Sequence, residues 1–582
     1  MRQAEEHVFQ TFDGVELFCR HWPATGNGKP ERAIVLFHRG HEHSGRLQHI
    51  VDELAMPEVP MFAWDARGHG RSPGQRGFSP SLGSSVRDVD EFVRHAAQVS
   101  GVPIENIVVI AQSVGAVLVS TWVHDYAPKI RGMVLASPAF KVKLYVPFAR
   151  PGLSLMEKLR GQFFVNSYVK AKFLSHDPER IASYEADPLI TRPIASHILL
   201  ALYEAAERVV ADAGAITVPT QLLISGADWV VHHGPQHAFF DRLGSVVKEK
   251  HVLDGFYHDT LGEKDRHLAF DKIRAFIDHL YASEAVQPDL LAADRHGHTA
   301  EEYRSLQQPL SPLSPKRVYF GLTKLNMRAF GSLSSGIKLG LKTGFDSGST
   351  LDYVYRNQVE GITPLGKLTD KIYLDSIGWR GIRKRKQHLE QLIGSAADQL
   401  KARNEPIRVV DIAAGHGRYV LDALQQIPEA EQILLRDYSP INVEQGGKLI
   451  EARGLGHKAR FVQGDAFDRD SLSSLDPKPT LAIVSGLYEL FPDNAPILAS
   501  LKGLADAVPV GGYLVYTNQP WHPQLELIAR ALTSHRDGQP WIMRRRTQAE
   551  MDALVEAAGF KKLTQRIDEW GIFSVSLAER VA

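Results

Sequence analysis

A serine in a short turn of small residues is the clearest candidate nucleophile in this chain. The apolar run Val108–Ile110 leads into Ala111-Gln112-Ser113-Val114-Gly115, and a segment compatible with a helix follows. Small residues on both sides of the serine suit a tight turn between a strand and a helix. Such a turn presents the hydroxyl at the end of a sheet and directs the first helical amides toward an oxyanion. Because such short patterns also recur by chance, the alternative is an ordinary strand-to-helix turn.

An acid and a histidine that could activate this serine follow later in the chain. A predicted strand, Gln221–Ile224, leads to Asp228, and a further strand at 250–253 leads to His258. Serine is a poor nucleophile at neutral pH, so a histidine must take its proton while an acid holds the imidazole in the right tautomer. The order serine, acid, histidine is typical of hydrolases built on a parallel sheet. The sequence predicts Ser113, Asp228 and His258 as the catalytic residues; the alternative is this fold with an inactive site.

Alternating strands and helices must position these three residues. We expect a hairpin over 8–23 with a turn at Asp13-Gly14, a buried strand at 33–37, a short strand at 61–64 and a helix over about 84–99. This alternation predicts an α/β fold with a parallel sheet. Residues from about 140 to 215 lack a strand pattern and contain Pro and Gly breaks, which favours a helical cap over the site; ordinary packing helices are the alternative.

Two further motifs support a known fold for the first half. They are the loop His38-Arg39-Gly40-His41-Glu42-His43-Ser44-Gly45-Arg46 and the turn Asp65-Ala66-Arg67-Gly68-His69-Gly70-Arg71-Ser72. With the serine turn, they make residues 8–280 resemble an α/β-hydrolase of the monoacylglycerol lipase and lysophospholipase group. The resemblance implies an oxyanion hole from the backbone amides of Gly40 and Val114, and a lipid or other small ester as substrate. Arg39 and His41 stand where that loop usually carries glycines, and a bulky or cationic side chain there could narrow the hole or bind an anionic group.

Composition excludes several classes of protein. A chain of 582 residues is too long for a single hydrophobic core, so we expect at least two domains. Lys+Arg and Asp+Glu are equal at 67 each, so no net charge favours binding to nucleic acid. The single cysteine, Cys19, excludes an internal disulfide and fits a reducing compartment. Neither histidine cluster (His38, His41 and His43; His232, His233 and His237) has the spacing of a zinc site, so no metal is predicted. Without a signal-like N-terminus or a long apolar run, we expect a cytoplasmic protein.

The middle of the chain divides the two halves. We place a hydrolase domain at 1–282, a polar, proline-bearing linker at 283–315, a basic extension at 316–400 and a second domain at 401–582. Between Tyr303 and Phe345 there is no acidic residue, and apolar residues alternate with basic ones. The basic residues are Arg304, Lys316, Arg317, Lys324, Arg328, Lys338 and Lys342. This stretch predicts peripheral contact with an anionic membrane, at its inner face; the alternative is a basic face that packs on a neighbouring domain.

The second half begins with a strand that ends in an acid and a glycine turn. Ile407–Asp411 leads to Gly415-His416-Gly417, and a second strand ends in Asp437. Glycines let the backbone approach a ligand at the start of a helix, and a carboxylate after the second strand suits a ribose diol. This pattern alone is shared by many nucleotide-binding folds. Val420 stands where a dinucleotide fingerprint carries its third glycine, which disfavours NAD.

Together with this glycine turn, the later strands make the second half resemble a known family. A third strand leads to Gly464-Asp465-Ala466, a fourth to Ser485-Gly486-Leu487-Tyr488-Glu489, and a fifth to Asn518-Gln519-Pro520-Trp521-His522. Residues 400–580 resemble a class I S-adenosylmethionine-dependent methyltransferase with a Rossmann-like fold, and 316–582 resemble the methyltransferase domain fused behind α/β-hydrolases in bacteria. The resemblance implies S-adenosyl-L-methionine as cofactor. Asp411, Gly415 and Gly417 would surround its methionine portion, Asp437 its ribose, and Asp465 and Ala466 its adenine. A domain that has lost the cofactor is the alternative.

The methyl acceptor should lie beyond the fourth and fifth strands. Tyr488, Glu489 and His522 are the candidates for this side, with Glu489 or His522 as a general base. Ordinary loop structure is the alternative for each. Asn518-Gln519-Pro520-Trp521 departs from the signature of amine methylation, so no nucleobase or amide acceptor is predicted.

Together these patterns predict a bifunctional enzyme. A serine hydrolase of a lipid ester precedes a methyltransferase that acts on a related small molecule or lipid. The alternative is an active hydrolase whose second domain only binds a ligand or docks at a membrane. The sequence leaves open whether water or an alcohol takes the acyl group, because both attack the same acyl-enzyme.

Overall fold

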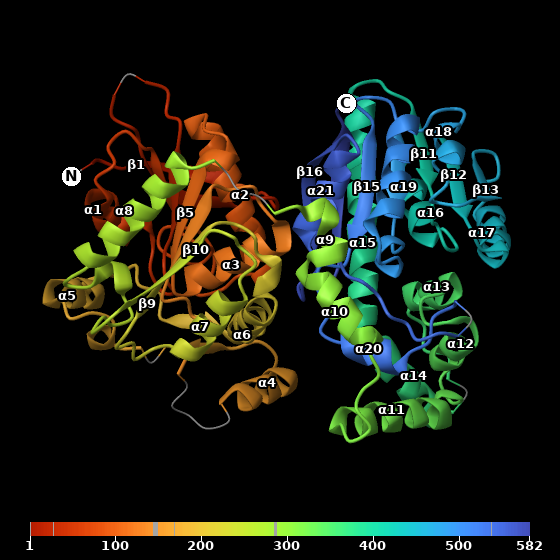
Figure 1. The fold of residues 1–582 in the computed structure, drawn as a ribbon, viewed down its shortest axis with the longest axis horizontal. Helices are drawn as coiled ribbons and strands as arrows, with labels where there is room; N and C mark the ends of the chain where they lie inside the picture. Colours follow the sequence, from red (N-terminus) through yellow and green to blue (C-terminus); the bar gives the residue numbers. More distant parts are fainter. Residues whose placement is uncertain are drawn as a thin grey trace. The chain divides into compact units, whose positions relative to one another are not determined.

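The computed structural model describes residues 2–26, 28–143, 149–167, 169–284, 288–361, 363–536 and 538–582. The chain divides into two compact units, Met1–Pro288 and Asp289–Ala582, and Figure 1 labels many of their elements. Each unit is built around its own sheet, so each is described by itself.

The first unit contains an eight-stranded sheet in the order β1-β2-β4-β3-β5-β6-β9-β10. β2 runs antiparallel to its neighbours β1 and β4, and the remaining pairs are parallel. The strands are β1 (Glu5–Gln10), β2 (Glu16–Trp22), β3 (Ala33–Phe37), β4 (Met61–Trp64), β5 (Ile107–Gln112), β6 (Gly132–Ala136), β9 (Thr220–Ser225) and β10 (Lys248–Leu253). Every residue of β3, β5, β6 and β9 is buried, as expected of parallel strands covered on both faces.

Helices cover both faces of this sheet. α1 (Gln48–Leu54) and α8 (His267–Ala282) pack with the face that carries Ile34 and Ile110. α2 (Leu82–Ser100) and α3 (Val114–Tyr126) pack against strands β3 and β5 as well as against each other. α7 (His233–Arg242) lies beside β9.

The cap predicted for about 140–215 is mainly helical in its described part. It contains α4 (Ala149–Arg160), α5 (Pro178–Ala186) and α6 (Ser196–Ala211), together with a two-stranded ribbon of β7 (Phe164–Asn166) and β8 (Pro193–Ala195). Asp177 caps α5 by accepting from the N–H groups of Glu179 and Arg180, and Pro178 occupies the first helical turn.

The second unit contains a seven-stranded sheet in the order β13-β12-β11-β14-β15-β17-β16. Five strands are parallel, and β17 runs antiparallel to both β15 and β16. The strands are β11 (Ile407–Asp411), β12 (Ala430–Asp437), β13 (Ala459–Gln463), β14 (Leu481–Val484), β15 (Tyr513–Asn518), β16 (Phe560–Ile567) and β17 (Ser574–Arg580). This order, which reverses direction between β11 and β14, is that of a Rossmann-like fold with an added antiparallel strand.

Both faces of the second sheet are also covered. Val409 belongs to a core with α15 (Ile377–Ala402), α16 (Arg418–Gln425) and α17 (Pro440–Ala452), whereas Val410 belongs to one with α19 (Asn494–Ala507) and α21 (Gln548–Ala557). Alternate residues of β11 therefore serve opposite cores. α18 (Arg469–Ser473) and α20 (Leu525–Ala531) are short.

The basic extension predicted at 316–400 is mainly helical in its described part. It contains α11 (Pro315–Gly331), α12 (Ser335–Thr343), α13 (Gly348–Arg356), α14 (Pro364–Leu374) and most of α15. Side chains from α12 to α15 form a small core with Ile572 and Phe573, which precede β17. The extension is therefore built into the second unit.

The structure differs from the expected linker at 283–315. α9 (Ala293–His296) and α10 (His298–Gln307) lie in this stretch and pack within the second unit. Ala300 and Leu306 are buried, and Glu302 pairs with the buried Arg545. The polar composition concealed these helices because only a few apolar side chains anchor them.

Candidate functional site

Ser113 occupies a sharp turn between β5 and α3. Its backbone has φ 55° and ψ −116°, a conformation that non-glycine residues rarely adopt and that marks stored strain at functional sites. Space beside the turn is tight, since a Cβ on Gly115 would lie 2.5 Å from the carbonyl oxygen of His38. The small residues around Ser113 are therefore a steric requirement of this turn.

Ser113, His258 and Asp228 form a hydrogen-bonded line at the carboxyl ends of three strands. The Ser113 Oγ lies 2.7 Å from His258 Nε2, and His258 Nδ1 lies 2.8 Å from Asp228 Oδ2. The other Asp228 oxygen accepts the N–H groups of Val230 and Val231. Burial raises the pKa of the Asp228 carboxyl, but His258 and these amides outweigh burial and hold it below its usual value. Asp228 thus stays ionised and fixes the His258 tautomer that leaves Nε2 facing the serine hydroxyl.

Gly40 and Val114 lie against each other beside Ser113. A Cβ on Gly40 would approach Val114 Cγ2 to 3.0 Å. Neither backbone amide donates a hydrogen bond to a described residue. Two free amides next to a nucleophilic serine are what an oxyanion hole needs.

Arg39 and His41 are engaged away from this hole. The Arg39 guanidinium pairs with Glu42 at 2.8 Å and with Asp259 at 3.4 Å. Burial lowers the pKa of His41 to about 4, so this ring is neutral, and its Nδ1–H donates to the carbonyl of Thr191 in the cap. The cationic charge that the sequence suggested beside the hole is therefore neutralised by buried carboxylates, and His41 instead joins the loop to the cap.

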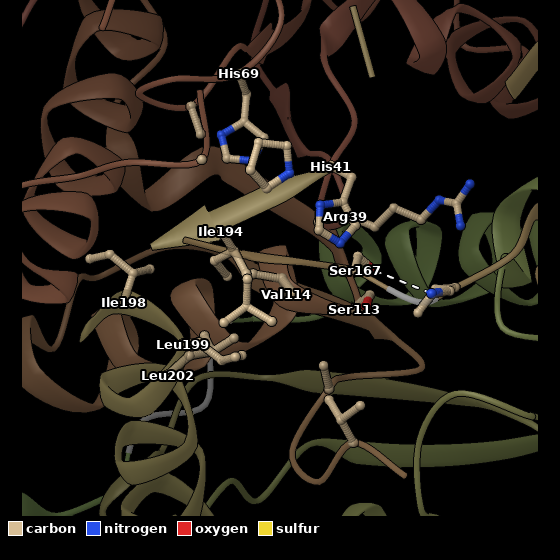
Figure 2. Close-up of a pocket in the computed structure, with 18 of the residues that line it drawn as sticks. Arg39, His41, His69, Ser113, Val114, Ser167, Ile194, Ile198, Leu199 and Leu202 are labelled. Carbon is tan, nitrogen blue, oxygen red and sulfur yellow. Dashed lines mark hydrogen bonds between the residues drawn. The ribbon is translucent and has the colours of Figure 1, made fainter. Parts of the chain in front are cut away.

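A cavity of about 580 Å³ opens beside Ser113. Figure 2 shows Ser113 and Val114 together with the cap side chains Ile194, Ile198, Leu199 and Leu202. Apolar side chains make up most of the wall, and the volume lies in the usual range for ligand sites.

In the second unit, the glycine turn lies at the carboxyl end of β11 and next to the end of β12. Gly415 and Gly417 both have positive φ, 57° and 75°. Asp437 accepts the Gly415 N–H through Oδ2 and the Asn442 side chain through Oδ1. Asp411 is fully buried and accepts the hydroxyl of Tyr419. The structure thus brings these four predicted cofactor residues to one edge of the sheet.

Asp465 and Ala466 follow β13 at the same edge. Gly464 donates its N–H to the carbonyl of Asp437, which fixes this turn beside the end of β12. Asp465 is exposed, whereas Ala466 is buried in the core with α19.

Helix α13 of the extension covers the glycine turn, a contact that the sequence did not reveal. A Cβ on Gly415 would lie 3.6 Å from the Cα of Gly348. Asp352 binds Arg418 through two hydrogen bonds of 2.6 and 3.1 Å. The one sequence signal that could have indicated this contact is an acidic residue, Asp352, shortly after a long basic stretch.

The three residues predicted on the acceptor side separate in the structure. Glu489 and His522 line one cavity of about 190 Å³. Tyr488 instead points into the core, where its hydroxyl is hydrogen-bonded to Ser500. An aromatic residue just after a strand can face the cavity or the core, and here the Tyr488 side chain packs in the core that includes α19.

The geometry of His522 does not fit a general base at Nε2. Its Nδ1 accepts the N–H of Gln524 at 3.0 Å. Burial lowers the pKa of His522 to about 4, so the ring is neutral and its one proton must be on Nε2. His522 therefore offers a donor to the cavity.

Three consecutive buried arginines hold the turn that carries Glu489. Arg544, Arg545 and Arg546 are each 1% exposed. Arg546 donates to the carbonyls of Tyr488 and Phe491, and Arg544 pairs with Glu550. Their burial is not predictable from the sequence, since three consecutive arginines usually indicate an exposed basic surface.

Two other features bear on the predictions. Among the described residues, no helix has the length and apolarity needed to cross a bilayer.

Although the sequence predicts no metal site, Glu5, His7 and His21 on the β1–β2 hairpin bring three potential ligand atoms within 4.8 Å of one another. Glu5 and His7 are exposed, and the three groups also pair among themselves.

Known proteins resemble both units. A family model described as "Serine aminopeptidase, S33" matches residues 28–265, and one described as "Putative methyltransferase" matches residues 273–580. A protein of Escherichia coli (strain K12) named "Uncharacterized protein YnbC" is 62% identical over 575 residues, which cover 99% of this chain and 98% of that protein. The monoacylglycerol lipase of Mycolicibacterium smegmatis is 28% identical over 281 residues (47% of this chain, 96% of the lipase). The monoglyceride lipase of Homo sapiens is 27% identical over 256 residues (42% and 80%).

Proposed function

We propose a two-part function on one premise: this chain belongs to the family described as "Putative methyltransferase" and carries a lipase-like hydrolase domain in front of it. The first unit acts as a serine hydrolase of lipid esters. The second acts as a methyltransferase that uses S-adenosyl-L-methionine. The observation that carries the proposal is the line of Ser113, His258 and Asp228 beside a large apolar cavity.

In the proposed hydrolysis, Ser113 Oγ attacks the ester carbonyl while His258 Nε2 takes its proton. The oxyanion that forms is stabilised by the amides of Gly40 and Val114, and Asp228 stabilises the protonated imidazole. His258 then gives the proton to the leaving alcohol, which leaves an acyl group on Ser113. A water molecule activated by the same histidine releases the acid.

A lipid ester is the substrate class that the cavity favours. Its volume of about 580 Å³ and its largely aliphatic wall suit an acyl chain. Two relatives that share this similarity are named as monoacylglycerol and monoglyceride lipases. An acylglycerol or lysolipid is therefore the substrate we propose.

For the second unit, Asp411, Gly415 and Gly417 would bind the methionine portion of S-adenosylmethionine, and Asp437 would hold the ribose hydroxyls. Asp465 and Ala466 would face the adenine. Two glycines with positive φ and carboxylates at adjoining strand ends form the kind of cradle that such a nucleoside needs. The cofactor supplies an activated methyl group, so the protein's task is to position the acceptor.

The exposed face of α11 supports peripheral contact with an anionic membrane. Val318, Tyr319, Leu322 and Leu325 are between 56% and 62% exposed, and 318, 322 and 325 share one helical face. The helix has no acidic residue, and its Arg317, Lys324 and Arg328 form no ion pair with a described residue. Apolar side chains flanked by unpaired cations are the pattern expected at an anionic lipid surface.

The hydrolase proposal is tested with a long-chain monoacylglycerol and a short soluble ester as substrates of the full-length protein. We expect fatty acid release from the monoacylglycerol, and a loss of about 10⁴-fold or more in kcat for Ser113→Ala, because the nucleophile is lost. Ser120→Ala, which removes another buried serine hydroxyl on α3, is the matched control and should retain activity.

Hydrolysis of the short ester with none of acylglycerols or lysolipids would contradict the lipid substrate. Equal activity of Ser113→Ala and the native protein would contradict the assignment of the nucleophile.

A further inference from the structure

A second cavity lies at the carboxyl ends of β14 and β15. It has a volume of about 190 Å³ and is lined by Gly486 and Glu489 after β14, Gln519 and His522 after β15, and Arg385 of α15. Most of its wall is aromatic or aliphatic, with the rings of Trp379, Trp541 and Phe573 among the lining side chains. In open α/β sheets ligands bind at this end of the strands, where the strand order reverses.

Several buried polar groups of this wall have no partner. The nitrogens in question are Arg385 Nε, Gln519 Nε2 and Trp541 Nε1, and none of them is hydrogen-bonded to a described residue. Arg385 and Gln519 are each only 2% exposed. A buried donor left unpaired costs about 1–3 kcal/mol, so several around one cavity indicate a ligand that accepts their hydrogen bonds.

The Arg385 guanidinium makes only long hydrogen-bond contacts with described residues, and one of its nitrogens makes none. Its Nη1 lies 3.5 Å from Glu489 and its Nη2 lies 3.5 Å from the Tyr355 hydroxyl, both at the outer limit for hydrogen bonds. Its Nε has no partner. Because the Tyr355 contact at Nη2 is long and Nε has no partner, the edge formed by Nε and Nη2 can bind a further acceptor. Two parallel N–H groups of this kind match the two oxygens of a carboxylate.

The remaining polar groups of the cavity either offer a donor or are already engaged. His522 offers Nε2–H, as its Nδ1 is already an acceptor for Gln524. The two carboxylates of the wall are already engaged, Glu489 with Arg385 at 3.5 Å and Asp346 with Ser534 and His535. A ligand with oxygen acceptors and no hydrogens to donate satisfies this set.

We propose that this cavity is the methyl-acceptor site and that it binds a compact aromatic or aliphatic carboxylate through Arg385. The proposal rests on the methyltransferase function proposed above. A carboxylate oxygen attacks the methyl carbon of the sulfonium donor, the carbon–sulfur bond breaks with its electron pair on sulfur, and a methyl ester and a thioether form. No proton is transferred, so the reaction needs no general base.

S-Adenosylmethionine also carries a carboxylate, at its amino-acid end. The location of the cavity therefore decides whether Arg385 binds the carboxylate of the methyl donor or that of the methyl acceptor. Asp411, Gly415, Gly417 and Asp437 do not line it. The cavity is also about a third of the 580 Å³ beside Ser113, which favours a small acid over an intact acylglycerol. These observations assign the carboxylate to the acceptor.

The test measures binding of benzoate, phenylacetate and hexanoate to the full-length protein by calorimetry, with the matching neutral amides as references. S-Adenosylmethionine binding is measured on the same samples. We expect at least one carboxylate to bind at least about tenfold more tightly than its amide. Arg385→Gln should weaken this binding by roughly 10- to 100-fold and leave the affinity for S-adenosylmethionine within about twofold.

Two further variants guard against a folding defect. Lys384→Gln removes an exposed charge next to Arg385 on the same helix and should bind like the native protein. Trp541→Phe removes the indole N–H and keeps a smaller aromatic ring, so carboxylate binding should weaken by about two- to tenfold. Methyl transfer from labelled donor to a bound carboxylate should give label that alkali releases as methanol.

Equal binding of carboxylate and amide would overturn the proposal, and so would no binding of any of the three acids by protein that binds S-adenosylmethionine. Loss of S-adenosylmethionine binding alone in Arg385→Gln would also overturn it, because that result would assign the carboxylate to the donor. Carboxylate binding without any S-adenosylmethionine binding would support the site and refute the methyltransferase function.

Discussion

Asp411 is a carboxyl group whose charge should change near neutral pH. It lies at the end of β11, where it accepts the N–H of Ala413 and the hydroxyl of Tyr419. Burial raises the pKa of Asp411 to about 7 against the effect of these hydrogen bonds, and the negative charge of Asp437 acts in the same direction as burial. The free protein therefore holds a mixture of neutral and ionised Asp411 in the physiological range.

We expect the affinity for S-adenosylmethionine to fall as pH is lowered from about 7.5 to about 5.5. The donor's α-ammonium group stays protonated throughout this window and favours ionised Asp411, which is progressively lost below its pKa of about 7. If neutral Asp411 does not bind the ammonium, the loss reaches about 25-fold. Calorimetry at several pH values measures it. Asp411→Asn should bind weakly and nearly independently of pH, and an unchanged profile in that variant would assign the titration to another group.

Single residues differ in how far the sequence could predict them. The positions of Ser113, Asp228 and His258 at strand ends were predictable, because local turn chemistry and chain order determine them. Arg385 stands between the basic residues Lys384 and Lys386, but its spacing to the buried Leu389 and Leu392 places it on the buried face of α15. Which atoms a buried arginine meets depends on distant segments, and a single sequence does not contain that information.

At the scale of elements, most of the parallel strands followed from apolar runs and turns, while the roles of several helices did not. α13 covers the glycine turn through the pair of Asp352 and Arg418, two residues 66 positions apart. α10 was mistaken for linker, because its anchoring contacts with Arg544 and Arg545 come from the far end of the chain. Contacts of such long range leave little trace in local composition.

α11 carries a prediction that belongs to the whole helix. We expect the protein to cosediment with phosphatidylglycerol vesicles more than with phosphatidylcholine vesicles, and less at high salt, because its cations face the lipid headgroups. Leu322→Glu combined with Leu325→Glu should reduce this binding by about tenfold or more, since two apolar side chains no longer enter the bilayer surface.

Val510→Glu alters a side chain that is 71% exposed elsewhere in the second unit and is the matched control. If this control loses binding as much as the double variant, or if the double variant binds normally, α11 is not the contact surface.

At the scale of the whole molecule, the two units contain cavities of different size and character. The cavity of about 580 Å³ lies beside the serine that we propose as the nucleophile, and the one of about 190 Å³ presents donors that we propose bind a carboxylate. An ester has no free carboxylate, whereas its hydrolysis produces one. The chemistry of the first unit can therefore supply the type of group that we propose the second unit binds.

The last prediction tests this order of reactions with monohexanoylglycerol and methyl-labelled S-adenosylmethionine. The native protein should place label in a product that alkali releases as methanol, because hydrolysis frees hexanoate for methylation. Ser113→Ala should give no label from the ester, and added hexanoate should restore labelling. Arg385→Gln should give much less label than the native protein from either substrate, because it binds the released acid more weakly. If Ser113→Ala labels the ester mixture as well as the native protein does, the acceptor is not the released acid. In that case the two sites act on separate substrates, and their fusion cannot be explained by transfer of one acyl group from hydrolysis to methylation.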